Sequence, residues 1–299
     1  MLTLRLVQLF IVCGATAITF GVIMWMYPPL LVWGLALSDR KSMCTVEEIQ
    51  LGAEMRWAFD KALSVGQGNL RLIESDPDGF VHWEASFGEF WLPQGSIGAM
   101  PTLLAQQLVD IYGVRSLIGP GDVVIDCDAR FGTYARQALR AGAAKVIAIE
   151  SDPARVECIR RNLEEEVESK RVVIYSYPMD LRSEEFPELD SRDIAADRAV
   201  RSPIHIDTLV RKLNLKRVDV IKFDVKGAAL LLLEGAEETL TTYRPRLVVS
   251  TEHAADDGVE ITEWITALGQ DYQTECGICS LGSDWKVKPD MITFQTLSP

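Results

Sequence analysis

Three acidic residues, Asp126, Glu150 and Asp224, each follow a short run of apolar residues rich in β-branched side chains. Such runs are typical of strands that are covered on both faces of a parallel sheet. The carboxyl ends of parallel strands meet at one edge, where cofactors bind in open α/β sheets. A carboxylate there can accept hydrogen bonds from both hydroxyls of a ribose, or remove a proton from a substrate. The spacing therefore predicts a cofactor site. The alternative is a turn that only packs a helix, followed by an ordinary solvated Glu150.

The segment 122–150 contains the parts that such a site needs. Residues 123–125 predict a strand, Gly132 ends the turn that follows, and apolar residues then recur at helical spacing as far as Gly142. Residues 145–149 predict a second strand. A β-α-β unit of this kind places the strand ends beside the amino terminus of the helix.

Predicted strands and helices also alternate along the rest of the C-terminal region. Residues 103–112 predict a helix before the central unit, and the two final strands predict an antiparallel pair that closes the sheet. The segment 181–203 is charged and bounded by proline, which predicts a long loop near the open sheet edge. The remaining elements are predicted at 153–163 (helix), 171–175 (strand), 206–213 (helix), 218–224 (strand), 227–240 (helix), 246–251 (strand), 259–268 (helix), 272–276 (strand) and 291–296 (strand).

The N-terminal stretch 6–37 contains no charged residue and is long enough to cross a bilayer. Pro28 and Pro29 are expected to end the helix, so the predicted span is 6–27. A signal peptide is the alternative, but its apolar region is shorter, and residues 35–37 make a poor cleavage signature. The sequence therefore favours a single-pass membrane anchor.

The side of the membrane is nearly undetermined by charge. Arg5 and the terminal amine lie before the span, whereas Arg40 and Lys41 lie after it. The second pair slightly favours a cytoplasmic location for the large domain.

Three regions are expected along the chain. Residues 1–43 form the anchor and its juxtamembrane segment, residues 44–102 form a small α+β cap, and residues 103–299 form the main α/β domain. Within the cap, residues 46–63 predict an amphipathic helix, and a β-hairpin is predicted across residues 80–92.

Charge and cysteine content narrow the function further. The net charge is −13, which repels phosphate backbones and argues against nucleic acid as a partner. The six cysteines are scattered and predict no disulfide framework. Cys127 and Cys158 are expected to be small core residues. Cys276 and Cys279 form a single CxxC without a partner pair, which indicates metal or redox chemistry only weakly, so no metal site is predicted.

The sequence lacks the motifs of two other protein classes. The Gly-x-Ser-x-Gly elbow of α/β hydrolases is absent. The G-x-G-x-x-G fingerprint of NAD-binding proteins is absent too, and only Gly132 remains in the turn, although Glu150 suits the ribose of either kind of cofactor.

Five landmarks in order resemble those of the FkbM-type methyltransferases, which depend on S-adenosylmethionine (SAM). The resemblance runs from about residue 103 to residue 294. It implies a Rossmann-like class I methyltransferase fold: a mostly parallel seven-stranded sheet with helices on both faces. The landmarks are DCDARFG at 126–132, IAIESDP at 147–153, IDTLV at 206–210, IKFDVKGAALLLLEGA at 221–236 and YRPRLVVSTEH at 243–253.

The resemblance also implies roles for individual residues. Asp126 and Gly132 would line the cofactor turn, Glu150 would hold the ribose, and Asp224 would lie where the methionine end meets the substrate. Two positions of the turn depart from the family pattern, because Asp128 replaces a Gly and Arg130 replaces an Asn. Both side chains would then line the cofactor site, and Arg130 could pair with the SAM carboxylate.

The acceptor side carries further departures. Lys226 and Ala229 each replace a Glu of the family pattern. Lys226 either binds an anionic group of the substrate or marks a site without a catalytic requirement. Methyl transfer to oxygen needs a base, for which Asp224, Glu252 and His253 are the candidates.

These observations predict a membrane-anchored SAM-dependent methyltransferase. From the resemblance alone, its acceptor is expected to be a hydroxyl of a saccharide, lipid or secondary metabolite. The alternative is a catalytically inactive relative that serves as an anchored binding or scaffold protein.

Overall fold

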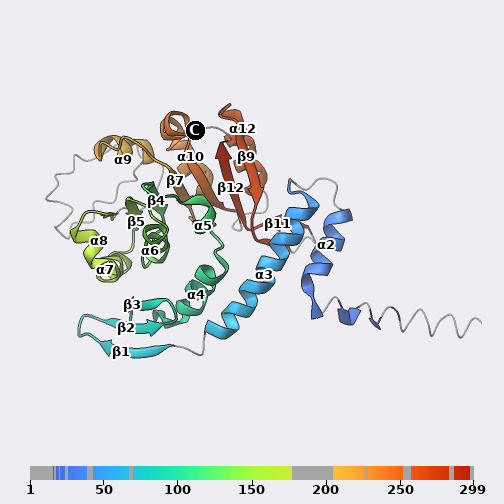
Figure 1. Ribbon diagram of the computed structural model, residues 1–299, viewed down its shortest axis with the longest axis horizontal. Helices are drawn as coiled ribbons and strands as arrows, with labels where there is room; N and C mark the ends of the chain where they lie inside the picture. The colour runs from blue at the N-terminus through green and yellow to red at the C-terminus, as the bar shows by residue number, and fades with distance from the viewer. Residues whose placement is uncertain are drawn as a thin grey trace, which may run out of the picture.

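The computed structural model describes residues 16, 18–19, 21–23, 26–38, 43–66, 70–176, 205–225, 228–251, 257–282 and 286–296 (Figure 1). The centre is a seven-stranded sheet in which β12 runs antiparallel to both of its neighbours, while the pairs among the other five consecutive strands are parallel. This confirms the predicted Rossmann-like sheet. Its order is β6 (Val172–Tyr175), β5 (Lys145–Ile149), β4 (Val123–Cys127), β7 (Val220–Phe223), β8 (Arg246–Ser250), β12 (Met291–Thr296), β9 (Tyr272–Cys276).

One row of residues crosses the whole sheet at its carboxyl edge. The strand registers align Cys127 with Ile149 on one side and with Phe223 on the other, and continue in both directions to the edge strands. The positions that follow these row residues in β4, β5 and β7 therefore lie together. The complete row is Tyr175, Ile149, Cys127, Phe223, Val249, Ile292 and Cys276.

Helices cover both faces of the sheet, because alternate strand residues are buried on opposite sides. Ile125 and Phe223 belong to one core cluster, and Val124 and Val220 belong to the other. The first cluster includes residues of α9 (Ile206–Lys212), α10 (Ala229–Glu234), α11 (Glu237–Tyr243) and α12 (Asp257–Ala267). The second includes residues of α5 (Val114–Leu117), α6 (Thr133–Arg140) and α7 (Pro153–Asn162), which is followed by the short α8 (Glu164–Glu168).

The N-terminal region is α+β, as expected. The predicted helix is α3 (Val46–Gly66), and the predicted hairpin is β2 (Phe80–Ala85) with β3 (Gly88–Pro93). A further strand, β1 (Arg71–Ser75), pairs with β2 and was not predicted, because all five of its residues are exposed and no apolar alternation marks it. A short 3₁₀ turn, η1 (Ser96–Ala99), leads into α4 (Met100–Val109), and α4 packs against α3.

The described part of the chain contains no helix with both the length and the apolar character needed to cross a membrane. Much of the expected span 6–27, including all of its residues up to 15, lies outside the described residues. Tyr27 is not helical, and α2 (Pro28–Ser38) begins at the next residue. Proline is favoured at the first position of a helix, so Pro28 starts a new helix as well as ending the previous one.

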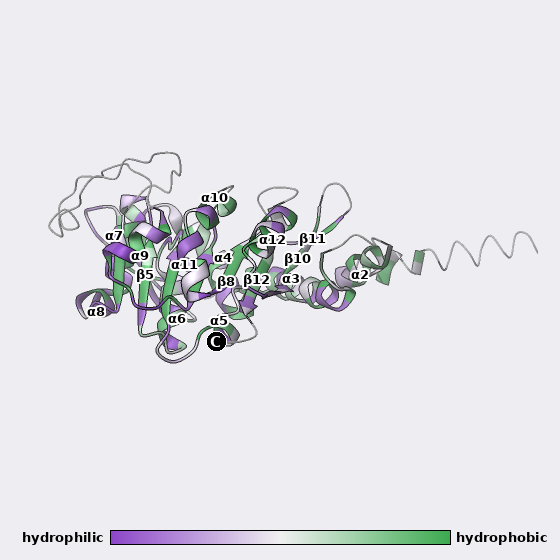
Figure 2. Ribbon diagram, turned by 90° about the horizontal axis from the view of Figure 1, so that it is seen from above, coloured by the Kyte–Doolittle hydropathy of each residue, from purple (hydrophilic) through white to green (hydrophobic). Residues whose placement is uncertain are grey.

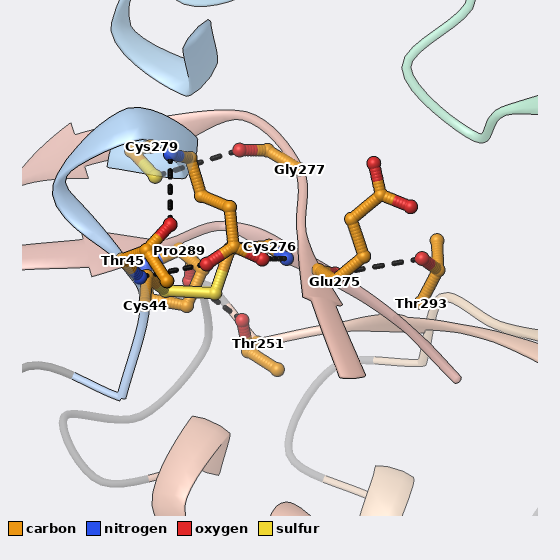
Figure 3. The surroundings of a disulfide bond; sticks show 10 residues. Cys44, Thr45, Thr251, Glu275, Cys276, Gly277, Cys279, Pro289 and Thr293 are labelled. Atoms are coloured by element: carbon orange, nitrogen blue, oxygen red, sulfur yellow. Dashed lines mark hydrogen bonds between the residues drawn. A yellow bond between two sulfur atoms is a disulfide. The ribbon is translucent and has the colours of Figure 1, made fainter. Parts of the chain in front are cut away.

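The cysteine prediction was wrong in one respect, because Cys44 and Cys276 form a disulfide (Figure 3). Their Cα atoms lie 5.9 Å apart and the two residues are separated by 232 positions in the chain. Cys127, Cys158 and Cys279 are free and buried. Cys279 starts β10 (Cys279–Leu281), which pairs with β11 (Val287–Pro289) in a small ribbon beside the main sheet.

Candidate active site

Asp126 and Lys222 form a fully buried ion pair between the two central strands. They are register partners on β4 and β7, and the Lys222 Nζ lies 2.9 Å from Asp126 Oδ1. Burial raises the pKa of Asp126, against the opposing effect of the Lys222 ammonium. Burial lowers the pKa of Lys222, but the attraction of Asp126 and Asp224 outweighs it, so Lys222 is a stable cation. Lys222 was not predicted as a site residue, although a lysine inside an apolar strand run is itself a signal for a buried anion.

Asp224 follows β7 and is held from one side. The Tyr112 hydroxyl donates a hydrogen bond of 2.8 Å to Asp224 Oδ2, and Lys222 Nζ lies 3.9 Å from the same oxygen. Burial, with the nearby Asp224 carboxylate, raises the pKa of Tyr112 well above 10, so its hydroxyl stays a donor. The Tyr112 oxygen in turn accepts a bond of 3.1 Å from Gln106. Among the described residues, Asp224 Oδ1 accepts no hydrogen bond.

Two polar atoms of this cluster are buried and have no partner among the described residues: Asp126 Oδ2 and the Tyr134 hydroxyl. The Tyr134 ring meets the Tyr112 ring edge to face, with centroids 5.5 Å apart. Lys222 Nζ lies 5.1 Å from one ring centroid and 5.4 Å from the other. Because a buried carboxylate oxygen without a donor is destabilising, this site suits a ligand that brings N–H or O–H groups.

The turn between β4 and α6 has a left-handed backbone at three positions, only one of which is a glycine. Asp128 has φ 61° and Arg130 has φ 53°, both in the left-handed region, and Gly132 has φ 77°. Left-handed conformations are uncommon for residues other than glycine, although Asp tolerates them better than most. Asp128 and Arg130 thus adopt a conformation that glycine adopts readily, and they add two charged side chains to the turn. At Gly132 a Cβ would lie 2.9 Å from Leu163 Cδ1. Glycine is therefore required at position 132 both for its left-handed backbone and for space.

The charge of Asp128 is balanced by two arginines, one in the turn and one in α7. Arg130 Nε lies 3.2 Å from one carboxylate oxygen, and Arg155 Nη1 lies 3.6 Å from the other. Arg155 is brought there by α7, whose first turn is capped by the Asp152 side chain. Because both arginine side chains are partly exposed, they can exchange Asp128 for another anion at small cost.

Glu150 binds the backbone of the same turn through its carboxylate. Its Oε2 accepts a hydrogen bond of 2.8 Å from the backbone N–H of Arg130, and its Oε1 accepts bonds of 2.9 Å from the N–H groups of Ser151 and Asp152. Burial raises the pKa of Glu150 to about 7, an effect that these N–H donors partly offset. Each carboxylate oxygen has two acceptor positions, so Oε1 is fully used and Oε2 retains one position for a further donor.

The structure thus brings together six predicted site residues: Asp126, Asp128, Arg130, Gly132, Glu150 and Asp224. Ala229 is the buried first residue of α10. Lys226, Glu252 and His253 lie outside the described residues. Tyr112 was missed because it precedes the motif region and no local pattern distinguishes it from a core aromatic.

Comparison with known proteins points to one family. A family model described as the methyltransferase FkbM domain matches residues 126–277. No curated protein matches the chain. Among solved structures, the chain is similar to a methyltransferase FkbM from Methylobacillus flagellatus, with 16% identity and a TM-score of 0.44, over 81% of this chain and 59% of that one. The chain thus spans less than two thirds of that protein's length.

Two further solved structures are similar at the same low level. A precorrin-6Y C5,15-methyltransferase from Geobacter metallireducens has 15% identity and a TM-score of 0.40, over 69% of this chain and 93% of that one. TrmK from M. capricolum, solved with S-adenosylhomocysteine, has 9% identity and a TM-score of 0.37, over 63% of this chain and 68% of that one. The fold itself is defined by the strand order and register described above.

Proposed function

Because the chain belongs to the FkbM methyltransferase family of SAM-dependent transferases, we propose that it methylates a hydroxyl group of a saccharide, lipid or secondary metabolite. The observation that carries the proposal is the convergence of three carboxylates at one sheet edge. Asp126 is the register partner of Lys222 in the central strands, and Glu150 and Asp224 each directly follow a residue of the row that crosses the sheet.

The residues at this edge fit SAM. Glu150, which follows the second strand of the unit, would accept a ribose hydroxyl through the remaining acceptor position of Oε2. The unpartnered Asp126 Oδ2 suits the ammonium of the methionine end, and Arg130 suits its carboxylate. The left-handed turn 128–132 would pass beneath the cofactor. When bound, SAM supplies an electrophilic methyl group on a sulfonium.

Asp224 is the preferred base for the acceptor hydroxyl. Tyr112 and Lys222 both engage Oδ2, which orients the carboxylate and leaves Oδ1 as the oxygen that accepts a proton. The protein's remaining contribution is to align the acceptor oxygen with the methyl group, since an in-line displacement depends chiefly on position. Glu252 and His253 remain proposed alternatives as the base, and Lys226 remains a proposed contact for an anionic substrate group.

Residues 6–27 are proposed as a membrane anchor. The support is the uncharged stretch 6–37, and the described residues between 18 and 26 that have assigned structure are helical.

Calorimetric titration of SAM into the full chain in detergent tests the function. We expect micromolar binding that Glu150→Ala weakens strongly, because the ribose loses its acceptor. The matched control is Glu164→Ala, an exposed carboxylate at the start of α8, which should leave the affinity unchanged. A folded protein that binds no SAM at millimolar concentration would contradict the proposal and favour the inactive scaffold.

A further inference from the structure

Helix α2 is apolar on every side, yet only one side is covered. Its sequence, PPLLVWGLALS, contains no charged residue. Val32, Leu35 and Ala36 pack into the cluster that surrounds the disulfide. On the other side, Leu31 and Trp33 are each 38% exposed and Leu37 is 55% exposed. Figure 2 shows the green, hydrophobic α2 at the end of the molecule opposite α7 and α8. A helix that is hydrophobic all round is normally buried in protein or in lipid.

The exposed apolar surface extends along the chain before α2. Ile18, Val22, Ile23 and Met26 are 47–71% exposed. With the three exposed residues of α2, they make up seven of the 14 large apolar side chains that are exposed in the described part of the chain. Contiguous exposed patches of this kind mark interaction sites. The patch continues an uncharged segment that begins at residue 6, so its chemistry suits a bilayer.

The disulfide fixes this patch at the carboxyl edge of the sheet. Cys276 lies in the same row as Phe223 and Cys127, at the carboxyl end of β9. Strands are spaced by about 4.8 Å, so β9 lies roughly 14 Å from β7 along this edge. The bridge from Cys276 to Cys44 holds the start of α3 there, and α2 packs against the bridge. A bilayer that receives α2 would therefore lie near the β9 end of the sheet edge that carries Asp224.

We propose that the exposed face of α2 lies in the interfacial layer of a lipid bilayer and that the methyl acceptor is a hydroxyl of a lipid in that bilayer. The inference rests on the proposed function and narrows its acceptor class. Trp33 and Tyr27 are amphipathic aromatic residues of the kind that lie at membrane interfaces.

Spin-label depth measurements test the docking. The full chain, carrying Cys13→Ser to remove a thiol in the expected span, is labelled at Leu31→Cys or Leu37→Cys and reconstituted into phosphatidylcholine–phosphatidylglycerol vesicles. Leu72→Cys on β1 and Val65→Cys on α3 are the matched controls, because both residues are at least half exposed and lie outside the patch. We expect labels at 31 and 37 to be accessible to oxygen and shielded from a water-soluble nickel complex, and the controls to show the reverse. Water-like values at all four positions would overturn the docking.

Transfer of labelled methyl groups tests whether the acceptor is a lipid or a saccharide. Methyl-labelled SAM is incubated with the reconstituted protein and either total lipid extract or soluble saccharides. We expect label in the lipid fraction, and we expect Leu31→Glu with Leu37→Glu to lower it by about tenfold or more, since charges oppose insertion. Leu72→Glu with Val65→Glu should not lower it. Label in saccharides alone would overturn the lipid acceptor. A protein that docks but binds no SAM would contradict the proposed function and leave the docking intact.

The disulfide carries a second inference, about the compartment. Cys44 and Cys276 are 6% and 5% exposed, and the structure around them is built to bring them together. The Glu48 side chain accepts hydrogen bonds from the backbone N–H groups of both Thr45 and Cys276, which ties the first turn of α3 to the end of β9. The Thr45 hydroxyl accepts in return from the Glu48 N–H, completing a capping box.

The free thiols of the described residues are protected from oxidation. Cys127, Cys158 and Cys279 are at most 1% exposed. Burial raises the pKa of Cys158 and of Cys279 to about 12, so neither forms the thiolate that reacts with disulfides. Disulfides persist in oxidising compartments and are rare in the cytosol, so the bridge between Cys44 and Cys276 favours an oxidising compartment.

We infer that the large domain faces an oxidising compartment, with the amino terminus in the cytoplasm. The charges on either side of the expected span are almost balanced, so they favour a cytoplasmic domain only slightly. The buried disulfide is stronger evidence for the opposite orientation. SAM is made in the cytoplasm and carries ammonium, carboxylate and sulfonium charges that do not cross a bilayer unaided. Methylation in that compartment would therefore require another membrane protein that carries SAM across the bilayer.

Translation of the full chain with endoplasmic reticulum microsomes tests the orientation. An Asn-x-Thr glycosylation site is added after Pro299 or, as the matched control, before Met1. We expect the C-terminal site alone to be modified, and a maleimide count of thiols in denatured protein to rise by two on reduction, but not in Cys44→Ser with Cys276→Ser. An unmodified C-terminal site, or a thiol count that reduction leaves unchanged, would overturn the inference.

Discussion

The turn after β4 and the bridged end of β9 lie along the same edge of one sheet, but they are stabilised by opposite means. The turn is polar: Asp128 is paired with two arginines, and Glu150 accepts three backbone hydrogen bonds. The bridged end is covalent and apolar, with the disulfide inside a hydrophobic cluster. The polar part can respond to a ligand or to pH, whereas the bridged part holds the neighbouring helices in one place.

The buried pair beneath the turn should produce the largest effect. Lys222→Met leaves Asp126 and Asp224 buried without their cation, and we expect a loss of about 3–5 kcal/mol of unfolding free energy. Urea denaturation at pH 7 measures it. Adding Asp126→Asn should recover much of the loss; a single variant as stable as the parent would mean that water reaches the pair.

Removal of the disulfide tests whether the bridged end of β9 contributes to stability independently of the turn after β4. Cys44→Ser with Cys276→Ser should lower the unfolding free energy by about 2–5 kcal/mol, because the unfolded chain is no longer closed into a long loop. Thermal denaturation under non-reducing conditions measures this. SAM affinity should stay unchanged. A fall in affinity would show that the bridged end and the turn after β4 are coupled, which contradicts their independence.

A methyl group at Gly132 tests the space beneath the turn. Gly132→Ala combines a left-handed backbone with a contact of 2.9 Å to Leu163, and we expect a loss of about 1–3 kcal/mol. Gly95→Ala is the matched control, since its φ of 87° is also left-handed but no atom lies within 4 Å of the added Cβ. Equal losses in the two variants would assign the whole effect to backbone strain.

The smallest effect concerns pH. The pKa of Glu150 is raised to about 7, so the carboxylate that accepts a ribose hydroxyl becomes fully populated only above that value. SAM affinity should therefore rise by up to about tenfold between pH 6 and pH 8. The folded state conversely favours the protonated acid, so the contribution of Glu150 to stability is present at low pH and is lost as pH rises through about 7.

Titration of SAM at a series of pH values measures the affinity, and Glu150→Gln should abolish its dependence. A pH dependence that persists in this variant would assign the titration to another group.

The central strands were predictable because their signal is local. The run 145–149 has the same bounds as β5, since a short, mostly apolar run between turns has one simple interpretation. The meeting of Asp126, Glu150 and Asp224 followed from the rule that parallel strands end at one edge. The helix predicted at 227–240 is divided within its described residues into α10 and α11, which no periodicity indicated.

The long-range partners were not predictable. Nothing near Cys44 indicates a partner 232 residues away, because the pairing depends on where α3 meets β9. Tyr112 reaches Asp224 from a segment 112 positions earlier in the chain, with no motif to mark it. Lys222 was within reach of sequence reasoning, since a cation in a buried strand requires an anion on a neighbouring strand.

The disulfide also makes a covalent ring of everything between Cys44 and Cys276, and this ring contains every strand from β1 to β8. A protease that cuts the backbone once inside the ring leaves a single molecule, with both fragments joined through sulfur. A nicked protein would therefore migrate as one species without reductant and as two with it. Damage to the chain can thus remain invisible to electrophoresis that leaves the sulfur bond in place.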